Sequence, residues 1–459
     1  MLVLASLGSG LVERLPISFP MVFLGLGFVL GGRGVGLIQF DAHDPVLEAV
    51  AIISLAFVLF LDAVRLRFEE LSREWLVPVL TLGPGTFLVI GIVAGAARLL
   101  LDASGVHSFL LGAILASTDP VVLRDVVRDE RIPVAVRRAL SVEGGVNDVV
   151  VLPIIVVLSA IALAEDRSAG GWLGFGAQLF VLGPAVGFAV GGVGSWLVGR
   201  VDRSMPIRRE YQALYGVGLV LAAYVAGTAV GGDGFLAAFA AGVAVAVLNN
   251  ELCDCFLEYG ETTAEMAMLL AFLLFGAVLS TLVGAVALGP TLAFAAVAVF
   301  AARPVAISLV LRHANISRRA RAFIGWFGPR GLASLLFALL VVNNGVPGGE
   351  GLLAVTGMVV IVSVVLHGAS AAPLSAWYGR AVQRETLAEE RESTASGLFR
   401  RPNSNAVARI SPDELAAALD SPDPPIVLDS RSRSQYDRDD ATRWAREQRA
   451  TGPVVVYCT

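Results

Sequence analysis

The sequence contains no lysine and few charged residues of any kind. All 34 basic side chains are therefore arginines, and charged residues make up only 16% of the 459 residues, against 56% hydrophobic residues. Soluble domains average about a quarter charged residues, so this composition excludes a chain that covers itself with an ordinary water-facing surface. Any cation inside a membrane segment must also be an arginine, which stays protonated.

Cysteine is equally scarce, because Cys253, Cys255 and Cys458 are the only three. Three cysteines do not make a disulfide framework, and the close spacing of Cys253 and Cys255 fits no standard metal site. We expect these two to be unpaired in a cytosolic loop. The net charge of −5 is a small sum over scattered loops, and we expect neither a nucleic-acid partner nor a cofactor.

Long apolar runs, in contrast, recur from the N-terminus to about residue 374. A span of the hydrocarbon core needs roughly 20 apolar residues, and we count about thirteen transmembrane segments. They are 2–12, 17–30, 46–61, 76–101, 109–122, 140–163, 172–198, 211–230, 235–248, 264–283, 288–311, 322–342 and 352–374. Glycine and alanine are dense in them, which suits close helix packing in lipid. The sequence therefore predicts an all-α polytopic membrane protein.

Arginines gather in loops that follow odd-numbered segments. They are Arg65, Arg67, Arg73, Arg124, Arg128, Arg131, Arg137, Arg138, Arg200, Arg203, Arg208, Arg209, Arg312, Arg318, Arg319 and Arg321. By the positive-inside rule these loops and the C-terminus are expected to be cytoplasmic, with the protein in the cell inner (plasma) membrane. The acidic stretch 249–261 breaks the pattern, but acidic residues weigh little in this rule.

The composition changes after about residue 380. The stretch 381–409 is polar and lacks apolar periodicity, which is typical of a linker. Residues 410–459 then contain a helix signal and two short strands, 426–428 and 454–457, as at the beginning of a soluble α/β domain. We therefore expect a transmembrane domain over 1–380, the linker, and a small partial α/β domain in the cytoplasm.

Seven ionisable residues lie inside the apolar segments. Each costs at least ~2.5 kcal/mol at the bilayer centre, so each needs a partner, a cavity or a function. They are Asp62, Asp119, Glu143, Asp148, Arg303, Arg330 and His367. We expect Asp62 to cap a helix end and His367 to be a hydrogen-bonded interior histidine, with pH sensing as the alternative for the histidine.

Asp119 lies in the run Ala116-Ser117-Thr118-Asp119-Pro120. Pro120 lacks an N–H group, and its ring crowds the carbonyl of Ala116. Backbone oxygens are thereby freed beside a hydroxyl and a carboxylate in mid-membrane. Broken helices of this kind line ion sites in transporters. The alternative is a proline kink that Asp119 merely caps.

Glu143 and Asp148 share one apolar segment. At 100° per residue, Glu143 and Asn147 lie on one helix face, while Asp148 points about 140° away from Glu143. Gly144 and Gly145 leave room beside the carboxylate of Asp148. Two acids on different faces suggest two roles, one in a permanent ion pair and one free to bind a cation or a proton. The alternative is two structural acids that are hydrogen-bonded to neighbouring helices.

Arg303 is the only charged residue in the middle of the eleventh segment. A buried arginine needs a carboxylate, and Glu143 is the best candidate. Arg330 and Gly331 follow a proline in the twelfth segment, which marks a second broken stretch. The fifth and twelfth segments would then correspond in two repeats of inverted topology, a pattern that points to a site at the membrane midplane.

Together these motifs resemble the monovalent cation:proton antiporter family that includes the sodium/proton exchangers. The motifs are Thr118-Asp119-Pro120, Glu143 with Asn147-Asp148, Ala302-Arg303-Pro304 and Gly328-Pro329-Arg330-Gly331, and the likeness covers about residues 15–380. The resemblance implies a core domain of two inverted repeats beside a dimerisation domain, hence a homodimer in the lipid bilayer. Two broken helices would cross at the ion site.

The resemblance also implies roles for single residues. Asp148 is the carboxylate that binds the monovalent cation and the proton, Asn147 shapes the site, and Thr118 and Asp119 contribute at the crossing. It further implies that Glu143 and Arg303 form a structural ion pair, and the Asn-Asp form implies electroneutral exchange. The resemblance implies sodium as the cation. The position after Glu143 is often a hydroxyl ligand in the family but is Gly144 here, and this departure leaves potassium as the alternative.

The tail resembles a rhodanese-like domain. The run Asp429-Ser430-Arg431 follows the first strand, and Cys458 follows the second, where the resemblance places the active-site cysteine. The loop that would wrap a persulfide begins beyond Thr459, so we do not expect sulfur transfer from this chain.

The residues as a whole predict a secondary active antiporter and not an enzyme. Asp148 would bind a proton or a cation but not both, and this competition couples the two fluxes. A membrane-anchored sulfur-transfer or sensor protein is the alternative of another class, but a passive anchor would not keep charges in its membrane segments. A channel is the third possibility, and it would not need a single competing carboxylate.

Overall fold

A computed structural model describes most of the membrane region and little of the tail. The described residues are 19–65, 80–119, 123, 126–129, 131–163, 168–205, 207–248, 250–314, 316–384, 426–429 and 454–457. The chain forms two compact units, Met1–Arg401 and Pro402–Thr459. The predicted segment 2–12, Pro120, the linker beyond residue 384 and Cys458 lie outside the described residues.

The first unit is helical. Its α-helices are α2 (Phe19–Leu30), α3 (Pro45–Arg65), α6 (Thr86–Leu100), α7 (Gly105–Ile114), α9 (Val134–Ala162), α10 (Ala169–Ala177), α11 (Gly183–Ser204), α12 (Arg209–Ala229), α13 (Gly234–Leu248), α14 (Asn250–Leu282), α15 (Leu288–Val297), α16 (Arg303–Val310), α17 (Arg318–Trp326), α18 (Leu332–Asn343) and α19 (Gly349–Arg384). Short helical turns extend or join some of them: η1 (Thr81–Gly85), η2 (Gln178–Leu182), η3 (Val283–Ala285), η4 (Ala298–Ala302) and η5 (Leu311–His313).

The described helices have the length and composition of membrane spans. Eight described helical runs are long and apolar enough to cross a membrane, and α2, α7, α13 and α18 are shorter apolar helices. Each predicted segment from the second to the thirteenth overlaps one of these helices or a run of them, but in the fifth segment the helix ends at Ile114 and residues 115–119 are not helical. The prediction of an all-α, multi-pass membrane protein is therefore confirmed, while the total of about thirteen spans stays a prediction.

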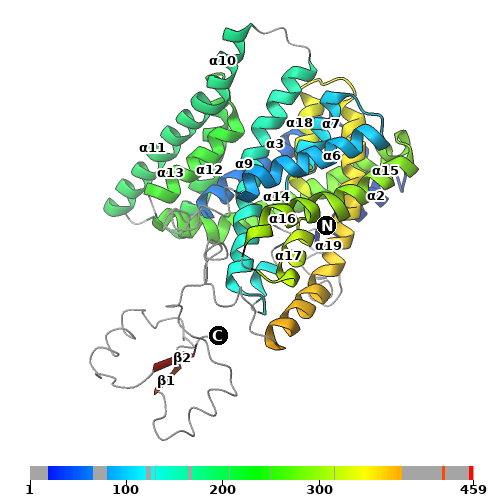
Figure 1. The fold of residues 1–459 in the computed structure, drawn as a ribbon. Helices are drawn as coiled ribbons and strands as arrows, with labels where there is room; N and C mark the ends of the chain where they lie inside the picture. The colour runs from blue at the N-terminus through cyan, green and yellow to red at the C-terminus, as the bar shows by residue number, and fades with distance from the viewer. Residues whose placement is uncertain are drawn as a thin grey trace, which may run out of the picture. The chain divides into compact units, whose positions relative to one another are not determined.

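The helices pack as two groups. The scaffold group contains α2, α3 and α10 to α14, in which α11 packs on α13, α13 on α3, and α14 on α2. The site group contains α6, α7, α9 and α15 to α19, in which α7 packs on α6 and α9, and α18 on α19. Figure 1 shows α10 to α13 gathered on one side of α9. The groups meet where α3 packs on α9 and α18, and where α19 packs on α2 and α14.

Three of the helical turns are π-helical, and each lies beside a proline. Pro84 lies within η1, while η2 and η4 end shortly before Pro184 and Pro304. Proline donates no backbone hydrogen bond, so the helix widens locally into a π turn, a feature that is frequent at functional sites. The residue after η1 is Thr86 and the residue after η4 is Arg303, and both side chains contact α9.

The second unit is described only at two strands. These are β1 (Ile426–Asp429) and β2 (Val454–Tyr457), which pair in parallel with Ile426 opposite Val454. Both strands lie where the sequence predicts them. Parallel neighbours need a crossover connection, whose residues lie outside the described part, so the α/β domain itself stays a prediction.

Candidate functional site

Two helix interruptions meet inside the site group. Helix α7 ends at Ile114, and the chain continues without helix to Asp119. Helix α17 ends at Trp326, and α18 begins only at Leu332. The backbone N–H of Asp119 donates to the carbonyl of Pro329 at 2.8 Å. The structure thus brings together the two broken stretches that the sequence placed in the fifth and twelfth segments.

Arg330 ties the second interruption to the first. Its Nη1 donates to the carbonyls of Ala116 (3.0 Å) and Ser117 (2.8 Å), just beyond the C-terminal end of α7. These carbonyls have lost their helical donors, and a cation is favoured at a helix C-terminus. The side chain is only 1% exposed. Arg330 therefore satisfies the interrupted end of α7.

His367 supports the same interruption from α19. The backbone N–H of Arg330 donates to Ser363 Oγ at 2.7 Å, and this hydroxyl lies 3.0 Å from His367 Nδ1. His367 Nε2 lies 3.0 Å from the carbonyl of Trp326. The ring is buried with both nitrogens in hydrogen-bond range, as expected for a hydrogen-bonded interior histidine.

Asp119 caps a helix of the opposite interruption. Its Oδ2 accepts the backbone N–H of Leu332 at 3.0 Å, at the first residue of α18. A carboxylate is stabilised at a helix N-terminus. Gly331 makes this contact possible, because a Cβ on Gly331 would overlap the Asp119 carboxylate. The side chains of Asp119 and Thr118 are both buried.

Asp148 lies in α9 next to the first interruption and is fully buried. Its Oδ1 accepts the hydroxyl of Ser117 at 2.5 Å. Its Oδ2 has no hydrogen-bond partner among the described residues. Burying a carboxylate oxygen without a hydrogen-bond donor costs free energy. Binding of a proton or a cation at this atom would remove that cost.

Asn147 joins α9 to both the interruption and η1. Its Nδ2 donates to the carbonyl of Ala116 (2.7 Å) and to Thr118 Oγ1 (3.4 Å). Its Oδ1 accepts the hydroxyl of Thr86 at 3.3 Å. These contacts use both ends of the amide and hold Asn147 and the adjacent Asp148 at a fixed position beside the break.

Glu143 and Arg303 form a buried, bidentate ion pair. Arg303 Nη2 donates to Glu143 Oε2 at 3.0 Å, and Nη1 donates to Oε1. The guanidinium also reaches the carbonyl of Ile324 at 3.4 Å. Gly328 leaves room for the arginine side chain, which a Cβ there would overlap. The two acids of α9 thus have different surroundings, one neutralised by arginine and one not.

Two hydroxyl residues of the site were not singled out from the sequence. Ser117 lies in the predicted break, but only Thr118 and Asp119 were proposed there. Thr86 follows Gly83-Pro84-Gly85 in the fourth segment, and that proline between two glycines was the available signal. Gly145, expected to leave room beside Asp148, instead faces open space, because a Cβ on Gly145 would meet no atom within 4 Å.

The site offers oxygen ligands only. No group of three or more His, Cys, Asp or Glu side chains that could hold a metal ion occurs in the described part of the chain. The carboxylate of Asp148, the hydroxyls of Ser117 and Thr118 and the carbonyls of the first interruption are oxygen groups, and hard oxygen ligands suit alkali cations. The geometry can therefore hold a proton or a small cation at Asp148.

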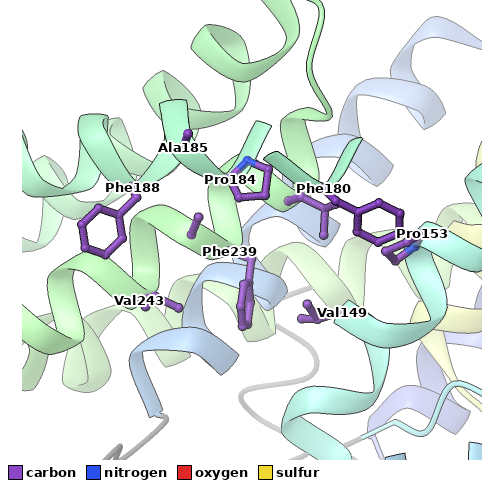
Figure 2. Close-up of a pocket in the computed structure, with 10 residues that line it drawn as sticks. Val149, Pro153, Phe180, Pro184, Ala185, Phe188, Phe239 and Val243 are labelled. Atoms are coloured by element: carbon purple, nitrogen blue, oxygen red, sulfur yellow. The ribbon is translucent and has the colours of Figure 1, made fainter. Parts of the chain in front are cut away.

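A nearby cavity has the opposite character. A space of about 470 Å³ lies between α9, η2, α11 and α13. Figure 2 shows Val149 and Pro153 of α9 facing Phe188 of α11 and Phe239 of α13 across it. None of its ten lining residues is charged, so it cannot bind a cation. It lies on the boundary between the site group and the scaffold group.

Comparisons with known proteins identify the family of the chain. A family model described as "Sodium/hydrogen exchanger, transmembrane" matches residues 2–377. The chain is 29% identical over 379 residues to the K(+)/H(+) antiporter NhaP of Alkalimonas amylolytica, covering 82% of this chain and 65% of that protein. It is 28% identical over 371 residues to the K(+)/H(+) antiporter NhaP2 of Shewanella baltica (strain OS223), covering 79% and 62%. The chain thus spans just under two thirds of the length of these relatives.

A solved structure shares the fold. The sodium proton antiporter MjNhaP1 from Methanocaldococcus jannaschii at pH 8 superposes with a TM-score of 0.67 at 22% sequence identity. The superposition covers 82% of this chain and 96% of that one. At this identity the likeness concerns the fold alone.

Proposed function

The chain belongs to the sodium/hydrogen exchanger family, a family of transporters and not of enzymes, and we propose that it exchanges a monovalent cation for protons across the membrane. The main support for this proposal comes from the contacts of the two carboxylate oxygens of Asp148. One of its oxygens is held by Ser117, and the other is buried and unpartnered among the described residues, beside two interrupted helices.

The coupling follows from competition at Asp148. A protonated Asp148 is neutral and does not attract a cation. The ionised carboxylate binds either a cation or a proton. Backbone carbonyls and hydroxyls of the interruption, with Asn147 and Thr118, would complete the cation's ligands. Binding one ligand thus requires release of the other, so cation movement drives proton movement.

The other charges of the site do not titrate in this proposal. Glu143 stays paired with Arg303, and Asp119 stays engaged with the N-terminus of α18. Asp148 alone then changes its charge state, one cation is exchanged for one proton, and no net charge moves per cycle.

Sodium is the proposed cation, as the sequence motifs suggest, and potassium is the second candidate. Potassium is favoured by the names of the two relatives, both K(+)/H(+) antiporters. Gly144 leaves the position after Glu143 without a side-chain ligand. Fewer protein ligands leave a looser site, which would suit the larger ion.

We further propose the architecture that the resemblance implied. About thirteen transmembrane helices would form inverted repeats with two crossing broken helices, and the site group would move against the scaffold group. The apolar cavity in Figure 2 supports such movement, because side chains without hydrogen bonds can slide past one another. A homodimer in the inner (plasma) membrane with a cytoplasmic C-terminus, and a partial rhodanese-like domain over 410–459, complete this proposal.

Dye fluorescence in everted membrane vesicles tests the function. Respiration acidifies the vesicle lumen and quenches a pH-sensitive dye, and an antiporter restores fluorescence when its cation is added. Vesicles that contain the protein should dequench with sodium, potassium or lithium, and the order of half-maximal concentrations identifies the preferred ion. A cation-dependent response no larger than that of vesicles without the protein would contradict antiport.

A further inference from the structure

The hydroxyl of Thr86 faces the side-chain amide of Asn147. Thr86 is the first residue of α6, directly after the π turn η1, and its side chain is 5% exposed. Its Oγ1 lies 3.3 Å from Asn147 Oδ1 and 3.3 Å from the carbonyl oxygen of Thr81. A hydroxyl carries one proton, so it donates to only one of these two acceptors at a time.

The orientation of the Asn147 amide is fixed at its other end. The carbonyl of Ala116, 2.7 Å away, can only accept a hydrogen bond, so the amide atom that faces it must be the nitrogen Nδ2. Oδ1 therefore points toward Thr86 and must accept. The hydroxyl of Thr86 is the one donor to this buried oxygen in the described part of the chain.

The π turn decides where the proton of Thr86 goes. Threonine hydroxyls in helices often bond back to a carbonyl of their own helix, and the carbonyl of Thr81 is the one in reach. This carbonyl already accepts the backbone N–H of Thr86, so it keeps a donor when the hydroxyl turns away. Asn147 Oδ1 would be left buried without one, which costs more. The hydroxyl therefore belongs to Asn147.

A second π turn acts on the same face of α9. Arg303 directly follows η4 and binds Glu143. Glu143 and Asn147 are four residues apart and lie one above the other on the helix. The turn η1 packs on α9 and α16, and η4 packs on α6. The two π turns thus each deliver one side chain to neighbouring positions of α9, one as an ion pair and one as a hydrogen bond.

We propose that Thr86 is a positioning residue for the cation site, an inference that rests on the proposed antiport. Its hydroxyl holds the amide of Asn147 in the orientation that binds the carbonyl of Ala116. Without the hydroxyl the amide would gain by rotating, and the bond to Ala116 would break. Asp148, the next residue, and the first interruption would then have to be ordered when the cation binds, and this ordering lowers affinity.

Three variants in everted vesicles test the proposal. Thr86→Val keeps the branched shape and removes the hydroxyl. The apparent KM for sodium or potassium should rise ~10-fold, toward the lower end of the cost of a buried acceptor without a donor. The maximal rate should fall less than about threefold, because only binding is weakened. Thr86→Ser restores the hydroxyl and should keep a KM near that of the wild type. The control Thr356→Val removes a buried hydroxyl of α19 that has no hydrogen-bond partner among the described residues and should leave the KM unchanged.

A binding measurement without transport complements these rates. A cation that binds the folded protein raises its melting temperature. In detergent, the rise caused by sodium or potassium should be smaller for Thr86→Val than for the wild type or Thr356→Val. Asn147→Ala removes the amide through which Thr86 acts, so Thr86→Val should cause no further loss of this rise in that background. The amount of each protein in the membrane is measured to correct the rates.

The outcomes are distinct. A wild-type KM and a wild-type rise in melting temperature for Thr86→Val overturn the positioning role and leave antiport intact. A defect of equal size in Thr86→Ser or Thr356→Val also overturns it, because the hydroxyl at this position would then not be the cause. Thr86→Ala removes the same hydroxyl and takes the place of Thr86→Val if that variant does not fold. Absence of exchange in the wild-type protein overturns the proposed function, and the positioning role with it.

Discussion

The hydroxyl of Ser117 donates to Asp148 Oδ1 at 2.5 Å, from the interrupted end of α7 to the middle of α9. This bond holds one oxygen of the carboxylate and leaves Oδ2 without a donor among the described residues. A hydrogen bond to a charged group contributes about 1.5–3 kcal/mol. The hydrogen bond from Ser117 therefore stabilises the ionised form of Asp148, which is the form that binds a cation.

Ser117→Ala should accordingly weaken cation binding without removing exchange. We expect the apparent KM for the cation to rise ~10-fold or more, which corresponds to the lower end of that free energy. Dye dequenching over a cation titration measures it. Ser159→Ala is the matched control, because this buried hydroxyl of α9 has no partner among the described residues. Equal KM values for the two variants would contradict a role for Ser117.

The Glu143–Arg303 pair should matter for stability more than for binding. Removing one partner leaves a buried charge without compensation, so Glu143→Ala and Arg303→Ala should each lower the free energy of unfolding by ~3–5 kcal/mol. The charge-swapped double variant should recover part of this loss. Thermal unfolding in detergent measures it, and single variants as stable as the wild type would show that the pair does not stabilise the protein.

Gly331 should tolerate no side chain. A Cβ there would overlap the Asp119 carboxylate, so Gly331→Ala must displace either Asp119 or the start of α18. We expect a loss of about 1–3 kcal/mol, as for overpacked interiors, together with impaired exchange. Gly95→Ala in α6 is the control, because its Cβ would meet no atom within 4 Å. Similar melting temperatures and rates for the two variants would disprove the close contact.

The ionisable site residues were predictable because an apolar segment makes a charged residue conspicuous. Asp148, Glu143 and Arg303 were singled out in this way. Helical spacing placed the two acids on different faces, and in the structure Glu143 pairs with Arg303 while Asp148 accepts from Ser117. For Ser117 and Thr86 the only signal was a neighbouring proline. That signal is weak, because hydroxyl residues are common in membrane helices and often bond to their own backbone.

Contacts between distant segments were not predictable from local pattern. The bond from Leu332 to Asp119 joins residues 213 positions apart, and its existence depends on how the two interruptions cross. For Asp62 the position at a helix end suggested a cap, but its side chain is buried and its Oδ1 lies 3.5 Å from Arg65 Nη1.

Exchange should be insensitive to membrane potential. One cation exchanged for one proton moves no net charge, whereas one moved charge would couple at about 2.3 kcal/mol per 100 mV. Because Asp119 binds the N-terminus of α18, we expect it to keep its charge. Sodium-driven proton flux, followed while valinomycin and potassium gradients set the potential, tests this. A rate that tracks the potential would mean that Asp119 titrates together with Asp148.

The central claim is that Asp148 alone exchanges a proton for a cation, and Asp148→Asn tests it most directly. The variant keeps the shape of the side chain but can neither release a proton nor neutralise a cation. Purified wild-type protein and variant are reconstituted into liposomes, and proton flux is recorded on addition of sodium or potassium. The account predicts cation-driven flux in the wild type and none in Asp148→Asn, with equal amounts of inserted protein. Flux at the wild-type rate in the variant would contradict it.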